Sequence, residues 1–463
     1  MTLHKMQGNV HRHATPAGAG DSMILTIACV CGFVFSLLIP LHGVLRVATE
    51  NPLLHAWKEV VLAVGLLATL TFGICSSKRS VWQLMSALLL MLFCYIAFRA
   101  INADAWVVVD GCLTMFGPAC AGLYYWNACH KIFMTGATPK SLLAIFLVAG
   151  FLSLWIAAEH SLGLASLLTE DQNLPRYMRE GITRARASFE SPMTAGQWMW
   201  FHGVLAFACG FIDRSRAKKI LLMTLSASMS IALVFTVSRG PYVLAVLSAT
   251  LLFLFAIALK QVDLAWKFFI GVTTMIVIAI PLAVFVTFDQ DAAALKVVAE
   301  SVLDPDERAN TTRGERWKAG FEMLSTQPLW GESIENISMK HLAMEEARHN
   351  IRENTFLDTH SALGLAGLLY VLVWYLLVTL ISTTALSASV GRSAFIWASI
   401  GLTLWLPWAI YGFAFPTFNT RFGAAVSWPI LGVAVAAFEI RKKMHRSNDG
   451  GYESPYRAAG SSP

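Results

Sequence analysis

The chain has 463 residues, of which 56% are hydrophobic and only 14% are charged, and its formal net charge at pH 7 is +6. Soluble domains carry about 25% charged residues, so the deficit places this protein in a lipid membrane and excludes an ordinary soluble enzyme. The modest positive charge does not indicate a nucleic-acid partner.

Apolar windows of the length of a spanning helix recur along the chain. A helix needs about 20 mainly apolar residues to cross a bilayer. We therefore predict an all-α polytopic membrane protein with about twelve transmembrane helices, near residues 23–45, 59–75, 82–98, 105–126, 141–158, 192–212, 220–237, 241–259, 268–288, 356–380, 393–413 and 422–440. The first window is longer than the apolar part of a signal peptide and lacks a convincing cleavage site, so it is interpreted as the first span.

Lysine and arginine in the short connections indicate the orientation. They gather in alternate connections and in the tail, which places both termini in the cytoplasm by the positive-inside rule. This predicts a cytoplasmic head over 1–22, a transmembrane domain over 23–446 and a disordered cytoplasmic tail over 447–463. Two large loops, 159–191 and 289–354, then lie on the periplasmic side, the second between spans nine and ten.

The smaller periplasmic loop ends in a run of arginines before a helix. The run reads Arg184-Ala-Arg186-Ala-Ser-Phe-Glu-Ser-Pro192, and proline is well suited to the first helical turn. Arg184 and Arg186 are therefore expected beside a helix N-terminus, which also favours anions. The alternative is that these side chains only reach the lipid phosphates of the membrane interface.

A second arginine lies in a tight connection between two spans, Ser238-Arg239-Gly240-Pro241. Glycine and proline force a turn there and bring the backbone close to whatever Arg239 binds. The alternative is an interfacial arginine without a ligand.

The larger periplasmic loop contains an amphipathic helix followed by a turn. Trp317, Phe321 and Leu324 recur at helical spacing after Arg313 and Arg316. The turn reads Pro328-Leu-Trp-Gly331. Such a helix rests either on the membrane or on the helical bundle.

Ionisable residues gather at the entrance of the tenth span. Glu353 and Asn354 precede it, and His360 is two helical turns below Glu353, on nearly the same face of a continuous helix. Such groups are costly in lipid, so we expect them to face a polar cavity. Asp358 belongs to this group, and Asp110, in the fourth span, is a further buried candidate without an obvious partner.

Common catalytic signatures are absent from the sequence. It holds no Walker loop, dinucleotide fingerprint, metal-spaced histidine pair or Gly-x-Ser-x-Gly, and its eight cysteines show neither metal-ligand nor disulfide spacing. Its outer loops instead contain arginines, whose planar guanidinium groups can bind two oxygens of a diphosphate. The outer arginines therefore suggest a lipid-linked diphosphate as the ligand.

The order of these motifs resembles the O-antigen ligase and polymerase superfamily, the bacterial Wzy/WaaL group. The resemblance covers roughly 140–380 by motif. It rests on Arg186-Ala-Ser-Phe-Glu-Ser-Pro192, Ser238-Arg239-Gly240, Arg316-Trp317 with Pro328-Leu-Trp-Gly331, and Glu353-Asn354-Thr355-Phe356-Leu357 with Gly364-Leu-Ala-Gly367.

The resemblance implies a multi-pass protein of the bacterial inner membrane that binds undecaprenyl-diphosphate-linked glycan at the periplasmic face, without a metal or other cofactor. Arg186, Arg239 and Arg316 would then bind the diphosphate. Family ligases place a histidine base where this chain has Glu353, so Glu353, or His360 further along, becomes the candidate catalytic group. Supporting roles fall to Arg184, Pro192, Asn354 and Gly331.

These expectations favour a metal-independent glycosyltransferase that polymerises O-antigen or exopolysaccharide repeat units. The first alternative is an O-antigen ligase that joins the glycan to lipid A–core. An alternative of another class is a flippase or exporter of the same lipid-linked sugar, but a transporter should carry polar residues deep in many spans. The expected partners are the lipid-linked glycan, a glycan or lipid acceptor and membrane lipids.

Overall fold

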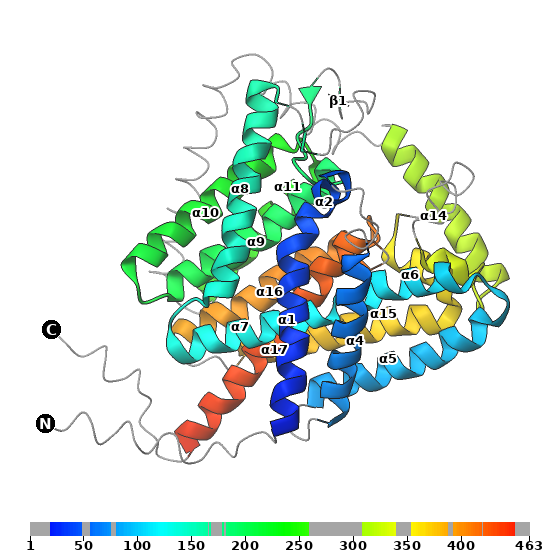
Figure 1. Cartoon of the computed structure of the whole chain (residues 1–463), viewed down its shortest axis with the longest axis horizontal. Helices are drawn as coiled ribbons and strands as arrows, with labels where there is room; N and C mark the ends of the chain where they lie inside the picture. The colour runs from blue at the N-terminus through cyan, green and yellow to red at the C-terminus, as the bar shows by residue number, and fades with distance from the viewer. Residues whose placement is uncertain are drawn as a thin grey trace, which may run out of the picture.

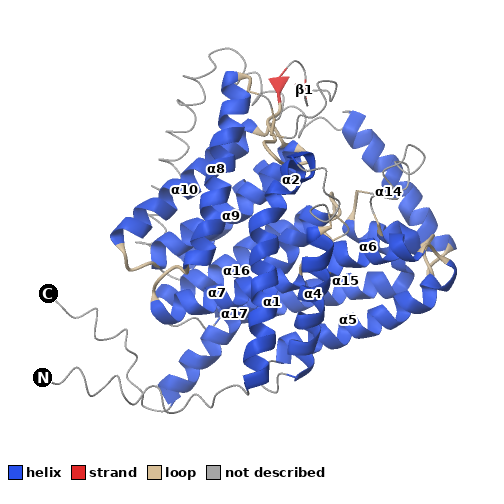
Figure 2. Cartoon of the chain, in the orientation of Figure 1, coloured by secondary structure: helices blue, strands red, loops and turns tan. Residues whose placement is uncertain are grey.

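The computed structural model describes residues 19–48, 56–75, 80–164, 166–167, 178–179, 182–258, 308–338, 353–387, 392–418 and 420–449. These residues are almost entirely helical (Figure 2). The strands among them are a two-residue antiparallel pair, β1 (Met178–Arg179) and β2 (Ile182–Thr183). The predicted all-α class is confirmed.

The α-helices follow one another along the chain as α1 (Ala19–Leu38), α2 (His42–Ala48), α4 (Trp57–Cys75), α5 (Ser80–Arg99), α6 (Ala105–Phe116), α7 (Ala119–Thr135), α8 (Lys140–Leu162), α9 (Pro192–Ile212), α10 (Arg216–Phe235), α11 (Arg239–Ala258), α14 (Arg308–Thr326), α15 (Thr355–Ser387), α16 (Arg392–Tyr411) and α17 (Arg421–Asp449). Short 3₁₀ helices complete the described part: η2 (Ile39–Leu41), η3 (Ala100–Asn102) and η4 (Ile334–Ile337).

Eight helical stretches of the described residues are long and apolar enough to cross a membrane: Ser22–Leu45, Trp57–Cys75, Val81–Asn102, Ala105–Thr135, Lys140–Leu162, Arg216–Phe235, Thr355–Ser387 and Arg421–Ile440. Helices α9, α11 and α16 coincide with three more predicted windows but are not among these eight. The window 268–288 lies outside the described residues. A polytopic membrane protein is thereby supported, and the count of twelve spans stays a prediction.

Close packing of small residues holds central helices together. A Cβ atom added to Gly432 of α17 would lie 2.1 Å from the carbonyl oxygen of Gly122 in α7, so the two backbones touch. Close backbone approach at small residues is how helices associate in lipid, where apolar burial alone provides little driving force. Aromatic rings fill the neighbouring space, as where Trp374 meets Trp405 at 5.1 Å and Phe418 at 4.7 Å.

Connections that the sequence assigns to one side of the membrane meet at one end of the bundle. The segment before α9 is bonded to the ends of two other helices. The amide of Ala187 donates to Glu159 of α8 at 2.7 Å, and that of Ala185 donates to the carbonyl of Phe235 in α10 at 3.2 Å. The 159–191 connection and the α10–α11 turn therefore lie together, as the predicted alternation requires.

The connections after α7 and after α9 join each other in the same way. Asp213 accepts from the backbone amides of Thr138 at 2.7 Å and Ser215 at 2.9 Å. Burial raises the pKa of this carboxyl, but the two amide donors, together with the Thr138 side chain and the charge of Lys218, hold the pKa below its usual value. These are two of the connections whose lysines and arginines the sequence places in the cytoplasm.

Helix α14 lies along the edge of the bundle, against α15 (Figure 1). A Cβ atom on Gly320 would lie 2.8 Å from Cδ1 of Leu357, so the glycine permits a close approach of the two helices. Met323 is buried, whereas the side chain of Phe321 is 57% exposed. The predicted helix is therefore present, but the predicted apolar position Phe321 is turned outward, and the buried residues are Gly320 and Met323.

Candidate active site

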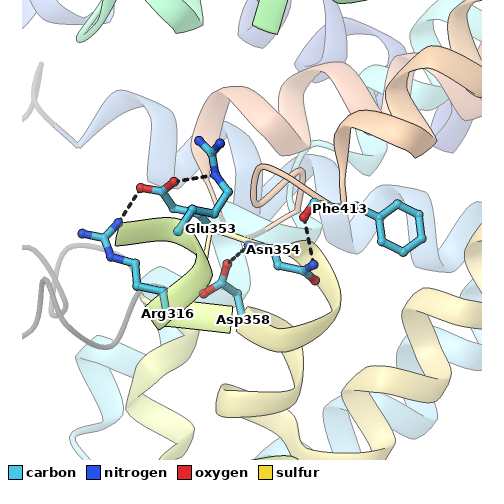
Figure 3. A network of polar contacts seen from close by, with 6 residues as sticks. Arg316, Glu353, Asn354, Asp358 and Phe413 are labelled. Carbon is cyan, nitrogen blue, oxygen red and sulfur yellow. Dashed lines mark hydrogen bonds and ion pairs between the residues drawn. The ribbon is translucent and has the colours of Figure 1, made fainter. Parts of the chain in front are cut away.

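Asn354 forms the N-cap of α15. Its Oδ1 accepts from the backbone amides of Phe356 at 3.0 Å and Leu357 at 3.2 Å, which satisfies two of the donors that a helix start leaves open. Its Nδ2 donates to the carbonyl of Phe413 at 2.9 Å, and its own amide donates to Asp358 at 3.0 Å (Figure 3). Asn354 thus ties α15 to the turn after α16. Its predicted supporting role at the site stays a prediction.

Glu353 precedes this cap and has a left-handed backbone, with φ at +53°. That conformation is costly for a residue with a side chain, so the surrounding contacts must hold it. Arg313 donates from Nε to Oε2 of Glu353 at 3.1 Å, and Nη1 of Arg316 contacts Oε1 (Figure 3). The carboxylate is thus clamped by two guanidinium groups from α14.

Two predicted site residues, Arg316 and Glu353, therefore meet directly. Arg348 and Arg352 are also close to Glu353 in the sequence, and both lie outside the described residues. All three side chains of the clamp are a quarter to a third exposed. They are accessible to a ligand, and Nε of Arg316 is buried without a hydrogen-bond partner in the described part of the chain.

His360 lies in a different set of contacts. Its Nε2 is 3.0 Å from the carbonyl oxygen of Pro328, and because a carbonyl only accepts, this nitrogen carries the proton. Since Glu353 lies before the N-cap with a left-handed backbone, the expectation that it shares a helical face with His360 is wrong. The contact ties His360 to the turn that begins at Pro328, and its predicted catalytic role stays a prediction.

The turn over Pro328–Gly331 docks into a break in α15. Gly364 interrupts the helix with φ at +59°, and Gly331 has φ at +70°. A Cβ atom on Gly331 would lie 2.2 Å from the carbonyl oxygen of His360, and one on Gly364 would lie 2.1 Å from that of Leu329. Both positions therefore require glycine, and the supporting role of Gly331 at the site stays a prediction.

The residues that follow this turn bind a second part of the bundle. Arg99, at the end of α5, donates to the carbonyl of Trp330 at 2.5 Å and lies over its ring. Ser338 donates to Asp110 at 3.1 Å, so this carboxylate has a partner that the sequence did not reveal. The segment 328–338 is thus held between α15 and the α5–α6 region, and it orients α14 with its two arginines.

The arginine run of the smaller loop joins the Ser238-Arg239-Gly240 turn. Arg184 donates from Nη2 to the hydroxyl oxygen of Ser238 at 2.9 Å. Arg186 is buried and its Nη1 is 3.4 Å from the carbonyl of Glu190. Pro192 occupies the first turn of α9 as predicted, after a capping box formed by Ser191 and Thr194.

Tyr411 connects this turn with the Glu353 clamp. Arg239 is the first residue of α11, and a Cβ atom on the following Gly240 would lie 2.6 Å from Cε2 of Tyr411. The next residue after the tyrosine, Gly412, accepts a hydrogen bond from the amide of Thr355 at 2.8 Å. Sequence reasoning missed Tyr411, because an aromatic residue at the end of a predicted span has no distinctive local pattern.

Charged groups from both motifs lie close enough to the phenol of Tyr411 to interact with it. The phenol of Tyr411 interacts with the charges of Arg239, Arg313 and Glu353. One end of the bundle therefore gathers the guanidinium of Arg239, the two arginines of α14 and one carboxylate. Such an arrangement can bind a dianionic ligand and hold a proton acceptor beside it.

Comparison with known proteins supports the resemblance. The O-antigen ligase family model, Wzy_C, matches residues 224–372, a stretch that includes Arg239, Arg316 and Glu353. No curated protein matches the chain. The family implies an enzyme of the glycosyl-transfer class with a lipid-linked glycan substrate in a membrane context. Residues 224–372 of this helical membrane protein are thus similar to the O-antigen ligase family, which supports the resemblance to the O-antigen ligase/polymerase superfamily.

Proposed function

We propose that the protein is a metal-independent glycosyltransferase of the bacterial inner membrane that polymerises O-antigen or exopolysaccharide repeat units. Its donor is an undecaprenyl-diphosphate-linked glycan, and its site opens to the periplasm. The observation that carries the proposal is the arginine-clamped carboxylate of Glu353, joined through Tyr411 to the turn that bears Arg239. Arginines and one carboxylate are the groups that a diphosphate leaving group and a hydroxyl nucleophile require.

In the proposed reaction the oxygen of an acceptor hydroxyl attacks the anomeric carbon of the donor sugar. The new carbon–oxygen bond forms as the bond between that carbon and the diphosphate oxygen breaks. The electron pair leaves on undecaprenyl diphosphate, where arginines neutralise the developing charge. The hydroxyl proton passes to the carboxylate of Glu353, which acts as general base.

The ion pairs of Glu353 suggest how donor binding changes the contacts of the site. A bound diphosphate offers Arg313 and Arg316 a more highly charged partner. As they turn to the diphosphate, the carboxylate of Glu353 becomes free to accept a hydrogen bond from the acceptor hydroxyl.

The polymerase assignment rests on the residue at position 353. Family ligases carry a histidine where this chain has Glu353, so we favour the polymerase over a ligase that transfers glycan to lipid A–core. Neither choice changes the roles proposed for Arg186, Arg239 and Arg316 on the diphosphate.

Deleting the gene and resolving the surface polysaccharide by gel tests the function. A polymerase predicts loss of long chains while single repeats remain attached to their carrier. Free polymer together with an unmodified lipid A–core would instead indicate a ligase, and accumulation of donor on the cytoplasmic side would indicate a flippase. Complementation with Arg239→Ala should fail, whereas Arg214→Ala, at the opposite end of the bundle, should restore the long chains.

A further inference from the structure

We propose that the hydroxyl group of Tyr411 binds the diphosphate of the lipid-linked donor, as a hydrogen-bond donor to an anionic oxygen between Arg239 and the Glu353 clamp. This inference rests on the proposed function, because it assigns a further residue to the same donor site. It goes beyond the arginines that the family resemblance implies.

The first support is the position of the tyrosine between two motifs. Its ring touches Gly240, beside Arg239, so closely that an added Cβ atom would lie 2.9 Å from the phenol oxygen. The turn that follows the ring is bonded to the start of α15, where Thr355 donates to Gly412 at 2.8 Å and Asn354 donates to Phe413 at 2.9 Å. The phenol therefore lies where the two halves of the site meet.

The second support is the direction of the phenol proton. Gln197 of α9 donates from Nε2 to the oxygen of Tyr411 at 3.0 Å, so this oxygen acts as the acceptor. The phenol proton then remains able to donate elsewhere. An oxygen of a bound ligand can therefore accept this proton.

The ring cannot simply turn the hydroxyl towards water. Tyr411 is only 8% exposed, its ring stacks on Phe415 at 5.4 Å, and Trp408 lies 5.6 Å away on its own helix. Gln197, which orients the oxygen, is fully buried. The hydroxyl is thus a fixed donor, ordered before any ligand arrives.

The charges around the phenol select an anion as its partner. Arg239 and Arg313 interact with it as cations, and the carboxylate of Glu353 is already bound by Arg313 and Arg316. An oxygen that approaches the phenol from between these arginines gains most when it is negatively charged. A diphosphate presents several such oxygens, whereas a sugar hydroxyl presents none.

The test is the affinity of the detergent-solubilised full-length protein for undecaprenyl diphosphate, measured by native mass spectrometry. Tyr411→Phe keeps the ring and removes the hydroxyl, and we expect an affinity about 10- to 100-fold weaker, the value of a hydrogen bond to a charged group. Tyr370→Phe is the matched control, because it removes a buried hydroxyl that has no partner in the described part of the chain. Its affinity and its unfolding temperature should match the wild type.

Three results would overturn the inference. Normal affinity of Tyr411→Phe, together with loss of binding in Arg239→Ala, would remove the phenol from the site and leave the proposed function intact. A much lower unfolding temperature for ligand-free Tyr411→Phe than for Tyr370→Phe would make the hydroxyl structural. If Tyr411→Phe bound undecaprenyl diphosphate normally and only the sugar-bearing donor more weakly, the hydroxyl would be assigned to the sugar. Normal binding in Arg239→Ala as well would contradict the proposed function itself.

Discussion

Arg313 and Glu353 form an ion pair with Nε and Oε2 3.1 Å apart, across forty residues of sequence. The pair joins an amphipathic helix outside the predicted spans to the entrance of a spanning helix. Together with the Arg316 contact, it fixes a carboxylate between two arginines of α14. Substitutions of the clamp residues can show whether these ion pairs belong to a catalytic site or are only structural.

Glu353→Gln should lower polymer formation by about 10²- to 10⁴-fold, the usual contribution of a general base. Glutamine keeps the shape and most hydrogen bonds of glutamate but cannot accept the proton. Glu353→His should retain more activity than Glu353→Gln, because imidazole is a base. The measurement is the rate of chain elongation with purified protein. Near-normal activity of Glu353→Gln would remove Glu353 as base and leave His360 or the substrate's own phosphate as the candidate.

Arg316→Ala should abolish donor turnover while changing stability little. Partly exposed ion pairs contribute only about 0–1 kcal/mol to folding, whereas a lost diphosphate contact acts on the reaction directly. Arg316→Lys should rescue activity poorly, since lysine cannot form the bidentate contact. The two measurements are the unfolding temperature and the turnover rate of each variant. Parallel losses of stability and activity would make the arginine a structural residue.

Gly331→Ala should destabilise the protein more than Gly163→Ala. Both glycines have positive φ, at +70° and +65°, so each substitution incurs the cost of a left-handed backbone, about 1–2 kcal/mol. Only at Gly331 would the added carbon also meet backbone, 2.2 Å from the carbonyl of His360. Comparing the unfolding temperatures isolates that contact. Equal decreases in unfolding temperature would show that the turn adjusts to the added carbon and does not position α14.

Reporter fusions after Ser325 and Ser447 should report opposite sides of the membrane. Ser325 lies on α14, in the predicted periplasmic loop, and Ser447 lies near the end of α17, in the predicted cytoplasmic tail. The expectation rests on the lysines and arginines of alternate connections. Signals from the same side would contradict the twelve-span topology and the periplasmic location of the site.

Local chemistry predicted much of this arrangement. Pro192 starts α9, and the turn at Gly331 and the helix α14 follow from the residues themselves. The break of α15 at Gly364 was not predicted, because glycine is tolerated in a spanning helix and only the docked turn makes the kink necessary.

Long-range partners could not be predicted in this way. The pairing of Arg313 with Glu353 and the approach of Tyr411 to Gly240 depend on how helices pack, and hydrophobic periodicity carries no information about distances between them. For the same reason the sequence placed Glu353 and His360 on one face, whereas the cap at Asn354 separates Glu353 from the helix.

The most direct test of the central claim uses the purified protein, undecaprenyl-diphosphate-linked repeat units and a glycan acceptor, with and without EDTA. The account predicts longer glycan chains and release of undecaprenyl diphosphate in equal amounts, unchanged by the chelator and lost in Arg239→Ala and Arg316→Ala. Elongation that requires a divalent metal, or that persists in both arginine variants, would contradict it.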